Sequence, residues 1–185
     1  MAEIKEPQKV LSIAGLICAH GFTADMCPEL SREFGSVILK SDIMRFSHTT
    51  YYNKEMGSDL TRQWYVFGNL VLPDELVRLK YRANAIEKKY VSEDGGRKVN
   101  IDPGLVSLSN LILASTKNYS HRVYLGQGIY AQITLIYRDG RFNPLEWTYP
   151  DYRENMALAF FTRARAILKD RYVEGKDVVL GDEDV

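Results

Sequence analysis

The sequence predicts a single α+β domain with a mixed or mostly antiparallel sheet covered by about three helices. Apolar runs of strand length recur along the chain, hairpin signals join several of them in a C-terminal meander, and amphipathic segments lie between and after them. No repeat, low-complexity tract or linker divides the chain. We therefore expect one domain over residues 1–175, followed by a flexible acidic tail at 176–185.

The first two elements are a buried strand and a short helix. Residues 9–19 form a nearly continuous apolar run after a proline, which is typical of a strand buried on both faces. Thr23 or Asp25 can cap the helix that follows, and Pro28 is tolerated because it falls in the first turn. We expect the helix to end at Gly35.

Two more strands and a helix come next. Residues 36–46 and 60–67 have strand composition, and the polar, aromatic residues 47–59 indicate a loop between them. The pair Gly68-Asn69 predicts a turn after the later strand. Pro73 then opens an amphipathic helix with apolar residues at helical spacing, namely Leu76, Leu79, Ala83, Ile86 and Tyr90.

The segment 98–114 is less regular. Residues 98–101 predict a short strand, and Asp102-Pro103-Gly104 predicts a turn after it. The apolar residues of 105–114 fit either a helical or a strand period, and we predict a helix there.

A meander and a long helix complete the predicted fold. Strands over 122–125 and 129–137 flank a glycine-containing turn and form a hairpin. Asp139-Gly140 makes a second hairpin turn into 141–145. A helix over 153–172 carries its apolar residues on one face.

Composition limits the classes of function. The 24 basic and 24 acidic side chains cancel, which argues against a general attraction to nucleic acid or to an anionic membrane. Cys18 and Cys27 form no zinc or disulfide pattern, and no motif names a cofactor. There is no signal-peptide pattern, and no apolar run approaches the ~18 residues that span a bilayer, so we expect a cytoplasmic protein.

Several blocks of the sequence are long enough to be specific: DIMRFSHTTYYNKEMG, VNIDPG, LASTKNYSHRVYLGQGIYAQITLIYRDGRF and WTYPDYR. They resemble a bacterial and archaeal family known only as domain of unknown function 4416. The resemblance extends from the first predicted strand to Arg153. It implies no activity, because the family has none assigned, although some members carry the label GTP-binding protein.

The residues do not support a conventional GTP site. A P-loop requires GxxxxGK[ST], in which backbone N–H groups surround the phosphates, and the chain has no such run. The guanine-specific NKxD pattern is approached only at 53–56, where Met56 replaces the carboxylate. Any GTP binding would therefore need another geometry.

Residues 117–122 form the first candidate site. His121 beside Arg122, with Lys117 nearby, combines a proton-transfer group with cations, which suits phosphoryl or carboxylate chemistry. The structural interpretation makes His121 a hydrogen-bonded strand-edge residue and Arg122 a surface ion pair. Neighbours on a strand would point to opposite faces, so both interpretations remain open.

Two aspartates are the other candidate catalytic residues. Asp102 lies at the predicted turn, where a carboxylate commonly accepts local backbone N–H groups. Asp151 precedes the last helix and suits its N-cap. We expect these capping roles for both, although a ligand is also often held where Asp151 lies, between a strand and a helix.

The loop 49–55 forms a second candidate wall, because exposed aromatic rings gain nothing unless they pack on the protein or on a ligand. His48 and Glu55 could join His121 and Asp151 around a metal, but their spacing is not diagnostic and we predict no metal site. The predicted ligand-binding residues are Thr50, Tyr51, Tyr52, Lys54, Glu55, Lys117, Arg122, Tyr130 and Tyr149.

Three functional hypotheses follow. The first is an enzyme or binding protein for a small anionic or nucleotide-like ligand, held in one pocket between 49–55 and 117–122. The second is an RNA-binding module, which requires a set of aromatic residues to lie on one exposed sheet face, namely Tyr51, Tyr52, Tyr124, Tyr130, Tyr137 and Trp147. The third is a structural or assembly protein, compatible with a homo-oligomer, whose polar residues form only caps and ion pairs. We favour the first, then the third.

Overall fold

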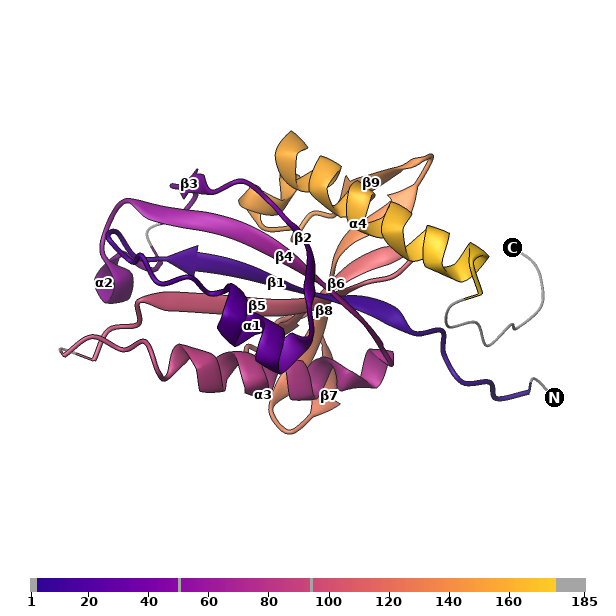
Figure 1. The fold of residues 1–185 in the computed structure, drawn as a ribbon, viewed down its shortest axis with the longest axis horizontal. Coiled ribbons are helices and arrows are strands. Elements are labelled where there is room, and N and C mark those ends of the chain that lie inside the picture. Colours follow the sequence, from indigo (N-terminus) through magenta and orange to yellow (C-terminus); the bar gives the residue numbers. More distant parts are fainter. Residues whose placement is uncertain (1–2, 50, 94, 176–185) are drawn as a thin grey trace.

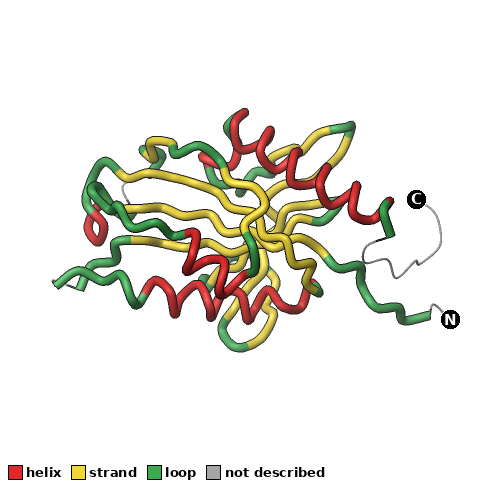
Figure 2. The backbone as a smooth tube through the Cα atoms, viewed as in Figure 1, coloured by secondary structure: helices red, strands yellow, loops and turns green. Residues whose placement is uncertain are grey.

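The computed structural model describes residues 3–49, 51–93 and 95–175. Over these residues the chain forms one α+β domain with a nine-stranded antiparallel sheet, as the sequence predicts (Figures 1 and 2). The predicted tail at 176–185 and the candidate residue Thr50 lie outside the described residues.

The strands are β1 Val10–Cys18, β2 Val37–Lys40, β3 Met44–Phe46, β4 Leu60–Val71, β5 Val99–Val106, β6 Asn110–Ser115, β7 Val123–Gly126, β8 Ile129–Arg138 and β9 Arg141–Pro144. The helices are α1 Cys27–Phe34, α2 Asn53–Met56, α3 Leu76–Glu87 and α4 Asn155–Val173, with 3₁₀ turns η1 Pro73–Glu75 and η2 Pro150–Arg153. The order across the sheet is β2-β4-β1-β5-β6-β8-β7, with β3 paired to β4 and β9 paired to β8.

Helices cover both faces of the sheet. α1 and α3 lie on one face and α4 lies on the other (Figure 1). Ala14 and Leu16 of β1 belong to the core beneath α1 and α3, whereas Leu11 and Ile13 of the same strand belong to the core beneath α4. β1 is therefore buried on both faces, which explains its nearly continuous apolar run.

Two strand predictions differ from the structure, one by an interruption and one in its length. Residues 36–46 form two strands, β2 and β3, separated at Ser41, whose hydroxyl accepts the N–H of Trp64 at 2.9 Å. The predicted turn at Gly68-Asn69 is wrong, because β4 continues to Val71. A Cβ on Gly68 would lie 2.9 Å from a methyl carbon of Ile38, so glycine here permits close approach of β2 rather than a turn.

The helix predicted over 105–114 is also wrong. Leu105 belongs to β5, and Asn110 begins β6. The Ser107 hydroxyl lies between the strands and accepts the N–H groups of Ser109 at 3.0 Å and Asn110 at 2.9 Å. The apolar spacing of 105–114 allows either a helical or a strand period. This local turn, together with the pairing of β6 to β8, favours the strand.

The remaining helices and hairpins lie close to their predicted positions, with two exceptions: the predicted loop 47–59 contains the short helix α2, and the N-cap residue of α1 is Met26 and not Thr23 or Asp25. α1 ends at Gly35, where φ is 99°, and Asp25 accepts the N–H of Cys27 at 3.0 Å. Asp139 and Gly140 have φ of 55° and 76° in the turn between β8 and β9. Within the described segments, no helix is both long enough and apolar enough to cross a membrane.

Candidate functional site

The sheet opens between β5 and β6. These strands pair only between 104–106 and 111–113, so the first half of β5 has no partner on that side. Two adjoining cavities of about 390 Å³ and 440 Å³ lie at this opening. We call the one that extends to α3 the polar pocket, the one that extends to η2 the tyrosine pocket, and both together the cleft. They share Tyr51, Tyr52, Asp102, Lys117 and Tyr149.

The predicted turn at Asp102-Pro103-Gly104 is absent, because β5 passes straight through it. Pro103 has no N–H to donate, and it lies where β6 is not paired with β5. A Cβ on Gly104 would lie 2.5 Å from the carbonyl oxygen of Ile112, so glycine allows β6 to approach at the next position. The proline and glycine therefore mark the edge of the opening.

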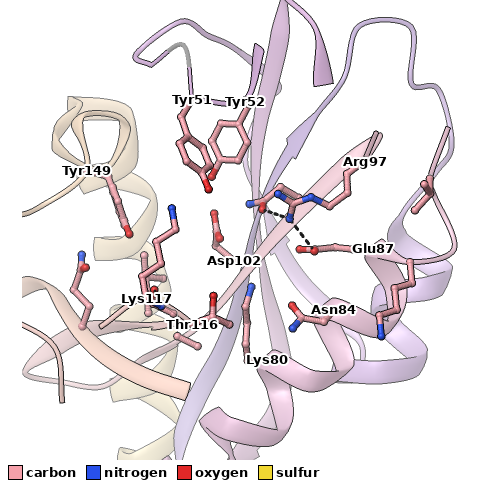
Figure 3. Close-up of a pocket in the computed structure, with 17 residues that line it drawn as sticks. Tyr51, Tyr52, Lys80, Asn84, Glu87, Arg97, Asp102, Thr116, Lys117 and Tyr149 are labelled. Atoms are coloured by element: carbon pink, nitrogen blue, oxygen red, sulfur yellow. Dashed lines mark hydrogen bonds and ion pairs between the residues drawn. The ribbon is translucent and has the colours of Figure 1, made fainter. Parts of the chain in front are cut away.

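Helix α3 supplies the hydrogen bonds that β6 does not supply to β5. The N–H of Ile101 donates to Glu87 Oε1 at 2.6 Å, and Lys80 Nζ donates to the Ile101 carbonyl at 3.1 Å. Lys80 and Glu87 are both buried and seven residues apart, on one face of the helix. Figure 3 shows Lys80 directed from α3 into the polar pocket, towards Asp102.

Arg97 forms one side of the polar pocket. Its guanidinium contacts both carboxylate oxygens of Glu55, at 2.6 and 2.9 Å, and Glu87 Oε2 at 3.1 Å. It also donates to Asn100 Oδ1 at 3.0 Å. The hydrogen bonds from Arg97 hold the pKa of Glu55 below its ordinary value. Both oxygens of Glu87 are thus used inside the protein.

Arg62 lies beneath the tyrosine pocket and is almost fully buried. Its guanidinium forms ion pairs with Asp151 at 2.8 Å and Asp102 at 3.4 Å. It also lies 5.0 Å from the ring centroid of Tyr152 and 5.6 Å from that of Trp64. The two aspartates come from β5 and η2, so Arg62 joins the sheet to the segment before α4.

The capping roles predicted for the two aspartates are wrong. Asp102 lies inside a strand and not at a turn. Asp151 lies in η2, and the N-cap residue of α4 is Glu154. The sequence could not show these roles, because the partner of both carboxylates is Arg62, which is distant in sequence and comes from β4.

Arg122 is buried and forms part of the tyrosine pocket. It donates to Gln132 Oε1 at 2.9 Å, Ser115 Oγ at 2.6 Å, the Lys117 carbonyl at 3.0 Å and the Tyr149 hydroxyl at 2.8 Å. All four acceptors are formally neutral. The surface ion pair considered for Arg122 is therefore replaced by a buried network that keeps its charge uncompensated.

His121 lies beside this network and outside the cleft. Its Nε2 is 3.1 Å from Gln132 Oε1, the same oxygen that Arg122 contacts. Its ring stacks on Trp147 with centroids 5.2 Å apart and an interplanar angle of 11°. His121 and Arg122 thus meet at one acceptor, because they lie in the turn before β7 rather than on a strand.

Three tyrosines from two loops cover the cleft. Tyr51 and Tyr52 precede α2, and Tyr149 precedes η2 (Figure 3). Burial raises the pKa values of Tyr52 and Tyr149 above the ordinary tyrosine value, so both hydroxyls are neutral at physiological pH. Lys117 Nζ lies 4.0 Å from the ring centroid of Tyr51 and joins the two sides of the opening.

The candidate residues do not all meet at one place. Those that line the cleft are Tyr51, Tyr52, Asp102, Lys117, Arg122, Tyr149 and Asp151. Lys54 and Glu55 line a separate hollow with His20. His121 and Tyr130 line neither pocket of the cleft, and Tyr130 packs against Tyr124 with ring centroids 5.1 Å apart.

Sequence reasoning missed several cleft residues that interrupt apolar patterns. Lys80 and Glu87 fall on the same helical face as the apolar residues of α3, where a charge is unusual. Arg62 lies on a strand whose next inward residue is the buried Trp64. In each case, a charged residue at a position where the pattern expects an apolar one could have indicated a functional residue.

The described residues contain no group of three or more His, Cys, Asp or Glu side chains that could hold a metal ion. His48 Nε2 lies 2.9 Å from Glu154 Oε1, whereas Glu55 contacts Arg97 and Asp151 contacts Arg62. Cys18 and Cys27 are free, and burial raises the pKa of the Cys18 thiol to about 11.

Fold and cleft define an antiparallel α+β domain whose central sheet is opened by a cation-lined cavity. The chain belongs to the family described as Domain of unknown function (DUF4416), whose profile matches residues 8–168. Comparisons with curated proteins and with solved structures find no significant match.

Proposed function

We propose that the protein binds a small anionic ligand in the cleft. The observation that carries the proposal is a group of cations that lack carboxylate partners. Lys80, Lys88 and Lys117 line the cleft, and among the described residues none of them has a carboxylate within ion-pair distance. A phosphate or carboxylate on a ligand would supply the missing charge through charge-assisted hydrogen bonds.

The carboxylates of the cleft do not compensate these cations. Six lysine or arginine side chains and three carboxylates line the two pockets. Glu87 contacts Arg97, and Asp102 and Asp151 both contact Arg62. The formal net charge of the whole chain is zero, so the positive excess is local to the cleft.

The dimensions of the cleft support the same class of ligand. Small-molecule sites are typically about 300–1,000 Å³ in volume, and each pocket falls in that range at about 390 and 440 Å³. An assembly protein would need no such cavity. An RNA platform has less support because its tyrosines are divided: Tyr51 lines the cleft, Tyr124 packs on Tyr130, and Tyr137 packs on Phe142.

A thermal-shift screen with matched lysine variants tests the proposal. The panel contains inorganic phosphate, pyrophosphate, di- and tricarboxylates, sugar phosphates and nucleotides. A ligand at a hundred times its dissociation constant adds about 2.7 kcal/mol to the free energy of unfolding, which is readily detected. Lys117→Gln should lose most of the shift, whereas Lys169→Gln, an exposed change on α4 outside the cleft, should keep it.

Two outcomes would count against the cleft. One is a panel in which no anion raises the melting temperature of the unmodified protein. The other is a ligand whose shift is the same in Lys117→Gln and Lys169→Gln, because that ligand binds elsewhere.

A further inference from the structure

We infer that the ligand has two parts, an oxyanion held in the polar pocket and a planar aromatic group held in the tyrosine pocket. This inference rests on the proposed function and deepens it. It follows from the hydrogen-bond donors, hydrogen-bond acceptors and charges of each pocket that are not already used in bonds within the protein.

Three buried acceptor side chains of the polar pocket are already used. Glu87 accepts from Ile101 and Arg97, Asn100 Oδ1 accepts from Arg97, and Gln132 Oε1 accepts from Arg122. An arginine can only donate, so these bonds fix which end of each amide is the oxygen. The buried nitrogens Asn100 Nδ2 and Gln132 Nε2 have no partner among the described residues.

Donors therefore dominate the wall of the polar pocket. Lys80 Nζ uses one of its three N–H groups on the Ile101 carbonyl. Lys88 and Lys117 line the same pocket, and no described carboxylate lies within ion-pair distance of either ammonium group. A cationic wall rich in donors suits a group that only accepts, such as phosphate or carboxylate.

The tyrosine pocket offers the opposite chemistry. The charge of Arg62 is paired with Asp151, the His48 ring contacts Glu154, and four of the five guanidinium N–H groups of Arg122 are used on neutral acceptors. Apart from Thr49 and the shared residues Asp102 and Lys117, the remaining lining is apolar or aromatic: Ile17, Phe46, Tyr51, Tyr52, Tyr119, Tyr149 and Pro150. Aromatic faces and neutral hydroxyls suit a flat, uncharged group that stacks and accepts or donates single hydrogen bonds.

The two pockets meet at a junction that admits one connected molecule. Tyr51 and Tyr52 lie on one side of Asp102, and Lys80 approaches it from the other (Figure 3). The Asp102 carboxylate is paired with Arg62 and is still 28% exposed. A second anionic group at the junction would meet this carboxylate, so the ligand should carry its charge at one end.

Titrations with three simple probes test the inference. Inorganic phosphate, methyl phosphate and phenyl phosphate share the oxyanion and differ in what is attached to it. We expect all three to bind, with a dissociation constant for phenyl phosphate at least tenfold below that for methyl phosphate. The binding is followed by protein NMR, which detects weak association.

Two variants separate the subsites. Tyr119→Ala should bring the affinity for phenyl phosphate close to that for methyl phosphate and leave inorganic phosphate unchanged. Tyr81→Ala is the matched control, because its side chain is exposed to a similar degree, 51% against 52%, and lines neither pocket of the cleft. Gln132→Glu keeps an acceptor for Arg122 but adds negative charge and removes an amide donor, so it should weaken all three probes alike.

The results distinguish failure of the inference from failure of the proposed function. If phosphate binds and the phenyl group adds nothing, the cleft binds anions but the two-part ligand is wrong. If no probe binds, both are wrong. If Gln132→Glu does not fold, Lys88→Gln, on the rim of the polar pocket, takes its place, and unchanged affinity for the probes in that variant would overturn the assignment of the oxyanion to this pocket.

Discussion

Single arginines hold the walls of the cleft together, and each does so by contacting side chains from at least two different elements or loops. Arg62 joins β5 to η2, Arg97 joins α2 to α3, and Arg122 joins the end of β6 to the loop before η2. Arg62 and Arg97 have carboxylate partners, whereas Arg122 has only neutral ones. This difference makes Arg122 both a structural residue and a source of positive charge.

Arg122→Ala should lower the free energy of unfolding by about 2–3 kcal/mol, because it removes hydrogen bonds from a charged group and leaves buried acceptors unpaired. Urea denaturation measures the change. Arg141→Ala removes an exposed arginine from β9 and should change stability by about 0.5 kcal/mol or less. Equal, small effects of both variants would show that the buried network contributes nothing to folding.

At the scale of secondary-structure elements, the opening of the sheet depends on α3 acting as a substitute partner for β5. Glu87→Ala should destabilise the protein by about 1–3 kcal/mol, because the buried N–H of Ile101 loses its acceptor. Glu87→Gln keeps an acceptor oxygen and should recover much of that loss. Hydrogen exchange at the Ile101 amide provides a local measurement, and unchanged protection in Glu87→Ala would contradict the role given to Glu87.

The short helix α2 is attached to the rim of the polar pocket by the ion pair of Glu55 with Arg97. Arg97 lowers the pKa of Glu55 in the folded protein, so this pair stabilises the fold at pH values above the ordinary glutamate pKa of about 4.3. The contribution is lost as the pH falls through the folded pKa. Because Glu55 is 37% exposed, solvent limits it to about 1 kcal/mol or less.

Melting temperatures of the unmodified protein and Glu55→Gln, measured from pH 7 to pH 3, test this dependence. We expect the variant to be less stable at pH 7 and the difference to shrink below about pH 4.3. A difference that stays constant over the whole range would mean that the ionisation of Glu55 does not contribute to stability.

The elements that could be predicted from sequence are those whose signals are local. The apolar run of 9–19 and the turn at Asp139-Gly140 determine their own conformations. The failures, at 68–69 and over 102–114, occur where glycine and proline serve close approach or a missing strand partner. The roles of these glycines and of the proline depend on which strands become neighbours, and the local sequence pattern does not show this.

The candidate site follows the same division. The loop tyrosines and Lys117 were predictable, because exposed rings and a local excess of cations are visible in sequence. Lys80 and Arg62 were not assigned, because their roles depend on Ile101 and Asp151, which are near them only in the fold. His121 was expected in the site and lies outside it, where it stacks on Trp147.

At the scale of the whole molecule, the cleft unites the two layers that the sheet otherwise separates. α3 reaches the opening from one face, while Tyr51, Tyr52 and Tyr149 reach it from the other (Figure 3). A cavity through a sheet exposes backbone groups that must find other partners, and here Lys80 and Glu87 provide them. Lys80 also contributes positive charge to the cavity. A residue that completes the hydrogen bonding of β5 is therefore also part of the proposed anion site.

The most direct test of anion binding in the cleft is a crystal structure with tungstate, a heavy tetrahedral anion that anomalous scattering locates without bias. We predict an anomalous peak in the polar pocket, within hydrogen-bonding distance of Lys80 or Lys117, and loss of that peak in Lys117→Gln crystals or in competition with phosphate. An empty cleft, with tungstate bound only at surface lysines, would contradict the proposed function.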